Sequence, residues 1–118
     1  MPRTALTPIV AVGGYPAAGV TLTWTAADVA NLNDFPFTGR ELVLIRNSHA
    51  VTGYTFTITS AADAMGRTKT ITDEAIAAGV TRCIGPMRAK TGWLQTAGKF
   101  HLAANNASVL FAIVRLTK

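Results

Sequence analysis

Residues 53–60 read GYTFTITS, and this stretch decides the fold class of the chain. Within it Tyr54, Phe56 and Ile58 alternate with three threonines. Successive side chains of a β-strand point to opposite faces of the sheet, so a period of two is typical of a strand that buries one face. Threonine and aromatic residues also favour strands. The stretch therefore predicts a half-buried β-strand.

Similar segments recur at short intervals on both sides of this strand. Residues 20–25 (VTLTWT) alternate in the same way, and residues 41–47 (ELVLIRN) form a denser apolar run of strand length. Further strand candidates are residues 67–72, 80–86, 92–97, 99–104 and 108–116. Many short strands separated by Gly, Asn and Ala-Gly turns are typical of all-β proteins. We therefore expect a single domain over residues 20–118, an antiparallel β-sandwich or jelly-roll-like barrel.

Residues 1–19 differ from the rest of the chain. They contain Pro2, Pro8 and Pro16 together with three glycines, which prevents a helix or a long central strand. The segment is expected to be an extended N-terminal arm in which residues 9–12 can pair as a short edge strand. An apolar arm without a core of its own is expected to lie on a neighbour. Its candidate contact residues are Leu6, Ile9, Val10 and Val12.

Two segments predict short helical turns within this β-rich pattern. In residues 25–33, Thr25 and Asp28 have the spacing of a capping box. In residues 72–79, a threonine and two acids are suited to a helix start, and Gly79 is suited to its end. Each is one or two turns at most. Capping explains these acids better than catalysis does.

The composition limits the kinds of protein that fit. A chain of 118 residues is one domain by the usual relation between length and domain number. Charged residues make up 14% of it, against about 25% in an ordinary soluble domain, which indicates a surface partly covered by another molecule. The sequence lacks an apolar run of the roughly 18–20 residues that span a bilayer, and its start does not resemble a signal peptide. We therefore expect a soluble protein without a membrane partner.

The net charge of +5 is spread unevenly along the chain. After residue 75 the sequence holds several cations and no acid. A basic half is typical of contact with nucleic acid or an acidic protein surface, although cations scattered over solvated strand faces give the same count. The chain lacks a Lys/Arg cluster with interleaved aromatics, so nucleic acid is not the expected partner. The candidate contacts from this group are Arg82, Arg88, Lys90 and Lys99.

The residue types that carry catalysis are sparse. His49 and His101 each lack a second ligand at metal-binding spacing, and Cys83 is the single cysteine of the chain. Alternation in residues 80–86 predicts that Cys83 is a small apolar packing residue. The motifs GxGxxG, GK[ST] and HExxH do not occur. We expect no enzyme, no cofactor, no metal site and no small-molecule substrate.

Two tryptophans differ in their setting. Trp24 lies on the apolar phase of its segment and is expected in the core, whereas Trp93 follows the basic sequence RAKTG and is expected to be exposed or at an interface. Trp93 is therefore a further candidate contact. With Tyr15 it keeps open a carbohydrate-binding adhesion module as an alternative function.

Three segments together resemble a group of small virion proteins of tailed bacteriophages. They are TAADVANLNDFPFTGRELVLIRNSHAVTGYTFTITS (residues 25–60), AGVTRCIGPM (residues 78–87) and SVLFAIVRL (residues 108–116). In that group an AAD…N…F…G…L…N segment leads into a Thr-rich strand, an AG…IGP turn and a last strand that ends in RL. The resemblance implies a jelly-roll-like domain of the decoration or auxiliary type, which coats an icosahedral head.

The resemblance also implies roles for single residues. Asn47 is expected to end its strand with a side chain that satisfies loop backbone groups. Other matching residues are expected to frame turns or close the end of the sandwich: Asn33, Phe35, Gly39, Arg40, Gly79, Gly85 and Pro86.

A decoration protein binds the major capsid protein and acts as a cement. The resemblance therefore implies a location on the capsid surface of the virion, after synthesis in the host cytoplasm. It also implies a homo-oligomer, with a trimer favoured. A head-to-tail connector or tail structural component is the first alternative.

Overall fold

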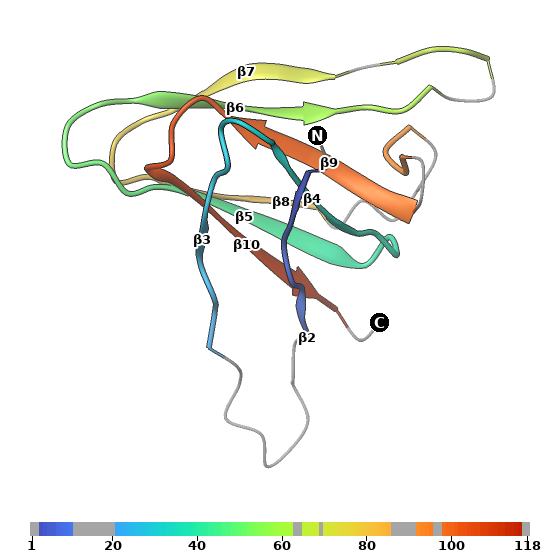
Figure 1. The fold of residues 1–118 in the computed structure, drawn as a ribbon, viewed down its shortest axis with the longest axis horizontal. Helices are drawn as coiled ribbons and strands as arrows, with labels where there is room; N and C mark the ends of the chain where they lie inside the picture. The colour runs from blue at the N-terminus through green and yellow to red at the C-terminus, as the bar shows by residue number, and fades with distance from the viewer. Residues whose placement is uncertain are drawn as a thin grey trace.

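Two β-sheets pack face to face in this computed structural model, which describes residues 3–10, 21–62, 65–68, 70–85, 92–95 and 98–116 (Figure 1). Sheet A holds, in spatial order, β1 (Thr4–Ala5), β4 (Asn33–Pro36), β9 (Lys99–Ala104), β6 (Tyr54–Thr59) and β7 (Ile71–Ile76). Sheet B holds β2 (Ile9–Val10), β10 (Val109–Arg115), β5 (Glu41–Asn47) and β8 (Thr81–Ile84), and β3 (Thr25–Ala26) also pairs with β10.

The strand order from β3 to β10 is that of a jelly roll. Sheet B contains β3-β10-β5-β8 and sheet A contains β4-β9-β6-β7, and every one of these pairings is antiparallel. If β3 is counted as strand 1, sheet B has the strand order 1-8-3-6 and sheet A has the order 2-7-4-5. Two Greek keys produce these orders in a jelly roll. The predicted all-β sandwich is therefore confirmed.

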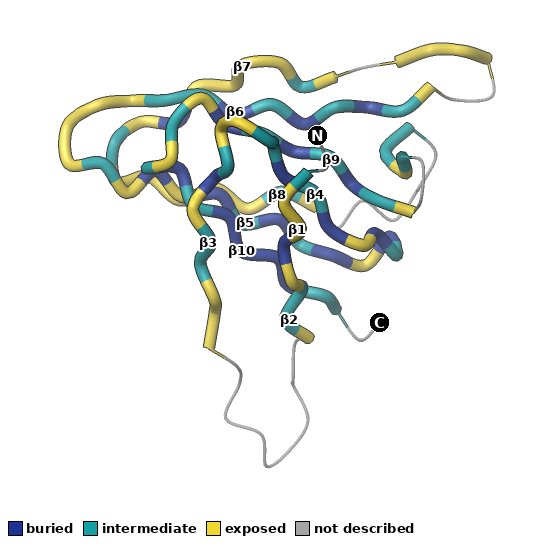
Figure 2. The backbone as a smooth tube through the Cα atoms, in the orientation of Figure 1, coloured by how far each residue is buried: buried dark blue, intermediate teal, exposed yellow. Residues whose placement is uncertain are grey.

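The core lies between the sheets and follows the alternation of the strands (Figure 2). In β6, Phe56 and Ile58 are buried while the threonines that alternate with them are partly exposed. Aromatic rings fill one end of the core, where Phe35 stacks on Phe100 with ring centroids 5.0 Å apart. The largest fully buried side chains also include Ile45, Ile76, Leu102, Phe111 and Ile113. The predicted strands at 41–47, 53–60, 99–104 and 108–116 are present. The strand predicted at 80–86 is shorter, Thr81–Ile84, and Pro86 lies outside the described residues.

Three predicted segments differ from the structure. In the described part of 20–25, residues 21–25, only Thr25 belongs to a strand, and in the described part of 92–97, residues 92–95, only Gln95 forms a bridge, to Lys99. The strand expected at 67–72 begins at Ile71 and continues to Ile76. The helical turn expected at 72–79 is therefore wrong: Ile71 and Ile76 insert into the core beside β6, and this pairing overrides the local capping pattern. Gly79, at φ 75°, serves the turn into β8 instead.

The other expected turn is present as a single turn with a different cap. The Leu32 amide donates to the Asp28 carbonyl (2.8 Å), and the Asn31 amide donates to Asp28 Oδ1 (3.0 Å). Asp28 therefore caps this turn, whereas Thr25 lies in β3 opposite Phe111. The strand β4, which follows directly, was not predicted, and its Asn33 and Phe35 are both buried.

The described part of the arm, residues 3–10, packs on its own chain. β1 pairs in parallel with β4 in sheet A, and β2 pairs in parallel with β10 in sheet B. The arm therefore crosses from one sheet to the other along an open edge of the sandwich. Leu6 lies at this crossing and is buried in the core, 4% exposed.

A buried carboxylate fixes the loop between the sheets. Glu41 is buried at the start of β5 and accepts hydrogen bonds from the Thr38 amide (3.0 Å), from Thr38 Oγ1 (2.8 Å) and from Arg115 Nε (2.6 Å). Burial by itself raises the pKa of Glu41, but the hydrogen bonds from Arg115 and Thr38 outweigh it and hold the pKa below its ordinary value. This network joins the first residues of β5 to the last residue of β10.

Candidate functional site

The sequence-predicted contact residues of the arm have different surroundings. Leu6 is a core residue, so its side chain is not available to a partner, and the expectation for it is corrected on this ground. Ile9 is partly buried and Val10 is 50% exposed. Val12 lies outside the described residues. The apolar surface that the described arm offers is therefore centred on Val10.

Polar contacts hold the start of the arm against sheet A. Arg3 donates to the carbonyl of Asn33 (3.1 Å), the Leu6 amide donates to the carbonyl of Asp34 (2.7 Å), and Thr4 hydrogen-bonds Asp28 through its hydroxyl. Hydrogen bonds from Thr4 and Asn31 hold the pKa of Asp28 below its ordinary value. Residues 3–6 are thus anchored to their own subunit.

Of the predicted basic contact residues, Arg82 and Lys99 belong to the described part of the chain, and they lie apart from each other. Arg82 lies in β8 and forms an exposed ion pair with Glu74 of β7 (2.8 Å), which links the edge strands of the two sheets. Lys99 begins β9 opposite Pro36. Arg88 and Lys90 lie outside the described residues.

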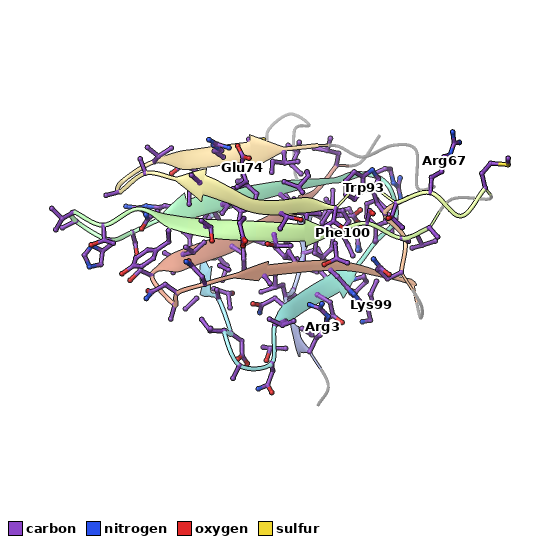
Figure 3. The ribbon with its side chains drawn as sticks, turned by 90° about the horizontal axis from the view of Figure 1, so that it is seen from above. Arg3, Arg67, Glu74, Trp93, Lys99 and Phe100 are labelled. Atoms are coloured by element: carbon purple, nitrogen blue, oxygen red, sulfur yellow. The ribbon has the colours of Figure 1, made fainter. Side chains whose placement is uncertain are left out.

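The structure brings Lys99 and Val10 to the same end of the sandwich. Val10 pairs with Arg115, Arg115 Nη2 donates to the Pro36 carbonyl (3.0 Å), and Pro36 pairs with Lys99. The exposed residue Arg40 joins this group because its carbonyl accepts the amide of Leu116 (2.8 Å). We call Val10, Arg40, Lys99 and Arg115 the basic end. Figure 3 shows Lys99 and Arg3 in the same half of the molecule, with Glu74 in the other.

Trp93 is partly buried. Its ring stacks on Phe100 with centroids 6.2 Å apart and an interplanar angle of 28°, and it packs against the core (Figure 3). A sugar-binding platform needs an aromatic face open to the ligand. The contact with Phe100 covers one face of the Trp93 ring. Tyr15 lies outside the described residues, and the carbohydrate-binding alternative stays a prediction.

Cys83 is exposed on the outward side of β8, opposite Leu44 of β5. The predicted alternation holds, since its neighbour Ile84 packs against the core. The expectation that Cys83 is a packing residue is wrong. Cys83 is exposed because β8 lies at the edge of sheet B, where few neighbouring side chains cover it.

The two histidines differ in their surroundings. His49 Nδ1 accepts the amides of Val51 (3.1 Å) and Thr52 (2.9 Å) and so caps its loop. Burial lowers the pKa of His101, Arg3 lowers it further, and Asp34 opposes both effects. Over the described residues, His, Cys, Asp and Glu side chains do not gather in a group of three that could hold a metal ion.

Asn47 has the role that its position predicted. Its Nδ2 donates to the carbonyls of Thr52 (2.9 Å) and Ile76 (3.0 Å), and its Oδ1 accepts the amide of His49 (3.0 Å). The buried side chain thereby satisfies backbone groups of two connections at once.

The outer face of sheet A is polar and carries a small hollow of about 140 Å³. Its outward positions alternate with the buried ones and are rich in threonine. The hollow is lined by Thr55, Thr57, Asp73, Ala103, Ala104 and Asn105. Its volume lies below the roughly 300–1,000 Å³ of pockets that hold drug-sized ligands.

The outer face of sheet B is apolar. Register places the outward residues of β5 beside those of β10 and β8, with Leu42 opposite Val114 and Leu44 opposite both Ala112 and Cys83. In the described strands β5, β8 and β10, the one charged side chain at an outward position is Arg46. We call the following residues the apolar face: Ile9, Leu42, Leu44, Cys83, Leu110, Ala112 and Val114. Sequence reasoning missed this face, although its signal was present in the dense apolar runs of 41–47 and 108–116.

The comparisons with known proteins add no relative: no protein-family model, curated protein or solved structure matches the chain. Within the described residues, no helix has the length and apolar character to cross a membrane.

Proposed function

We propose that this chain is a structural protein of a tailed-bacteriophage particle, which binds the outside of the head and stabilises it as a cement. The observation that carries the proposal is the basic end. There an exposed apolar arm residue, Val10, and the cations Arg40 and Lys99 come together from the arm, a loop and a strand far apart in sequence. A partly apolar, cationic surface suits docking on an acidic protein surface.

The jelly-roll strand order supports the proposal, because the resembling phage proteins are of the jelly-roll type. The shared residues also occupy positions that suit them. Gly39 and Gly85 have φ angles of 89° and 103°, which favour glycine, and Asn47 satisfies two loops.

The mechanism is the burial of surface across neighbouring capsid subunits. An interface of about 1,600 Å² has a large gross hydrophobic term, at about 25 cal/mol per Å², most of which the cost of association offsets. Repetition over the many equivalent sites of a head multiplies the remainder and opposes expansion under internal pressure.

Cryo-electron microscopy of the intact particle tests the location. Density over the capsomers is expected. Density at the portal vertex would instead favour the connector or tail alternative, and absence of the chain from purified particles would rule out both.

A pair of variants tests the basic end on purified heads. Lys99→Gln is expected to weaken binding and to reduce its dependence on salt, because it removes a cation from the contact. Arg82→Gln is the control, since Arg82 belongs to the opposite edge and pairs with Glu74. Equal binding by both variants would contradict a contact through the basic end. Deletion of residues 1–19 is a poor test, because it also removes Leu6 from the core.

A further inference from the structure

The two broad outer faces of the sandwich differ in character. Outward positions of sheet A include Asp34, His101, Thr59, Thr57 and Ala103, which register places side by side. The matching positions of sheet B form the apolar face. Within it Ile9, Leu42, Leu44 and Leu110 are partly exposed and Cys83 is exposed. Ala112 and Val114 are buried, at 1% and 9% exposed, and contribute little to its open surface.

The sequences of the strands show the same difference between the two outer faces. A strand with one solvated face alternates between apolar and polar residues, as β6 does with YTFTIT. β5 reads ELVLIRN and β10 reads VLFAIVR, so both are apolar at consecutive positions in their centres. Continuous apolar runs are typical of strands that are buried on both faces. In the described structure the inner sides of these strands face the core and their outer sides form the apolar face.

We propose that the apolar face is covered by the same face of a second copy of this chain, which makes the protein a two-fold dimer in solution. Arg46 lies at one end of the face, opposite Leu110 of β10, whereas Leu42 and Val114 lie at the other. Antiparallel stacking of two such faces places the two Arg46 side chains at opposite rims. Like charges are then kept apart, and no buried carboxylate is needed to neutralise them.

A two-fold pair also fits better than a ring. In a two-fold contact both copies use the same patch, whereas a ring needs two different complementary patches. Among the described residues the apolar outward positions gather on sheet B, and sheet A offers a polar face instead. The structure therefore favours a dimer over the trimer that the sequence resemblance implied.

The area of the face agrees with a weak, reversible dimer. The 22 residues of β2, β3, β5, β8 and β10, at a rise of about 3.4 Å each and a strand spacing of about 4.8 Å, give an outer face of roughly 360 Å². This is the size of the largest apolar patch on a typical monomer, roughly 300–600 Å², which is often functional. Two copies cover roughly 700 Å² in total, which is below the about 1,000 Å² of a stable specific interface and suits a weak, transient one.

Sedimentation equilibrium of the full chain over a concentration series tests the dimer. The wild-type chain is expected to pass from monomer to dimer, and Leu44→Glu is expected to remain monomeric, since it places a charge at the centre of both copies of the contact. Leu44→Thr, which keeps a good strand former, is expected to weaken dimerisation on the order of 100-fold, because it removes a leucine contact twice. Thr59→Glu, at an outward position of sheet A opposite His101, is the matched control and is expected to dimerise as the wild type does.

Alkylation of Cys83 gives a second readout that does not depend on mass. Its thiol is exposed in the monomer and lies on the apolar face, so its reaction rate is expected to fall as the protein concentration rises. The rate in Leu44→Thr is expected to stay constant over the same range. The proposal would be overturned if the wild-type chain stayed monomeric at the highest concentration or formed a trimer. Equal losses of dimer in Leu44→Thr and Thr59→Glu would also overturn it. Because these measurements need no phage particle, their outcome is separate from that of the capsid proposal.

Discussion

Arg115 Nε lies 2.6 Å from Glu41 Oε2, and this ion pair closes the ladder between the first residue of β5 and the last residue of β10. The Glu41 side chain is fully buried and that of Arg115 is 27% exposed. The same guanidinium donates to the Pro36 carbonyl, which belongs to the other sheet. One side chain therefore joins both sheets at the basic end.

Removal of this carboxylate is expected to destabilise the fold. In Glu41→Gln the neutral amide leaves the Arg115 charge without a partner and cannot accept all the hydrogen bonds that Glu41 accepts. We expect a loss of roughly 2–4 kcal/mol in the free energy of unfolding, measured by urea denaturation. Arg82→Gln breaks an exposed ion pair and is expected to cost less than about 1 kcal/mol. Similar losses in the two variants would contradict the role assigned to Glu41.

The same pair predicts a loss of stability in acid. The pKa of Glu41 is lowered in the folded protein, from an ordinary value of 4.5, so the carboxylate contributes stability above pH 4.5. That contribution is lost as the pH falls through the lower, folded-state pKa. The difference in unfolding free energy between wild type and Glu41→Gln should therefore be constant near neutral pH and shrink below pH 4.5. A difference that grows in acid would show that burial, which raises this pKa, prevails over the hydrogen bonds.

The sequence was sufficient for the strands whose pattern is local. β6 and β9 could be read from alternation because each has one buried face and one polar face. β4 could not, since its four residues, NDFP, combine turn formers with a proline, and it is held by pairing with β9. β7 was hidden for a related reason: its acids suit a helix start, and only the partner β6 makes it a strand.

The surface residues were harder to predict than the core. Alternation correctly separated Cys83 from Ile84, yet it could not tell that β8 is an edge strand and leaves Cys83 open. Leu6 looked like a contact residue because a Pro/Gly-rich arm has no periodicity, and its burial follows from two parallel pairings that join the arm to β4 and β10. Both facts depend on strand neighbours that are distant in sequence.

The burial of Leu6 predicts that the arm contributes to folding. Leu6→Ala is expected to lower the free energy of unfolding by about 2–4 kcal/mol, since it leaves a cavity where the arm crosses between the sheets. Val10→Ala, four residues further along the arm and half exposed, is expected to cost less than about 1 kcal/mol. Thermal unfolding of both variants measures the difference. If Leu6→Ala unfolds like the wild type, residues 3–6 are not part of the cooperative fold.

Substitutions of Asp73 are expected to differ in stability according to how easily each residue adopts the backbone conformation at this position. It has a φ angle of 47° in β7, next to an irregularity in the register between β6 and β7, and its amide donates to Thr57 Oγ1 (3.1 Å). Glycine adopts this left-handed conformation without strain, aspartate tolerates it, and a β-branched residue does so at a cost of roughly 1–3 kcal/mol. Any residue but proline keeps the amide donor. We therefore expect Asp73→Gly to unfold within about 1 kcal/mol of the wild type and Asp73→Val to lie well below both. An Asp73→Val variant as stable as Asp73→Gly would mean that β7 runs through this position in the ordinary extended conformation, without the irregularity.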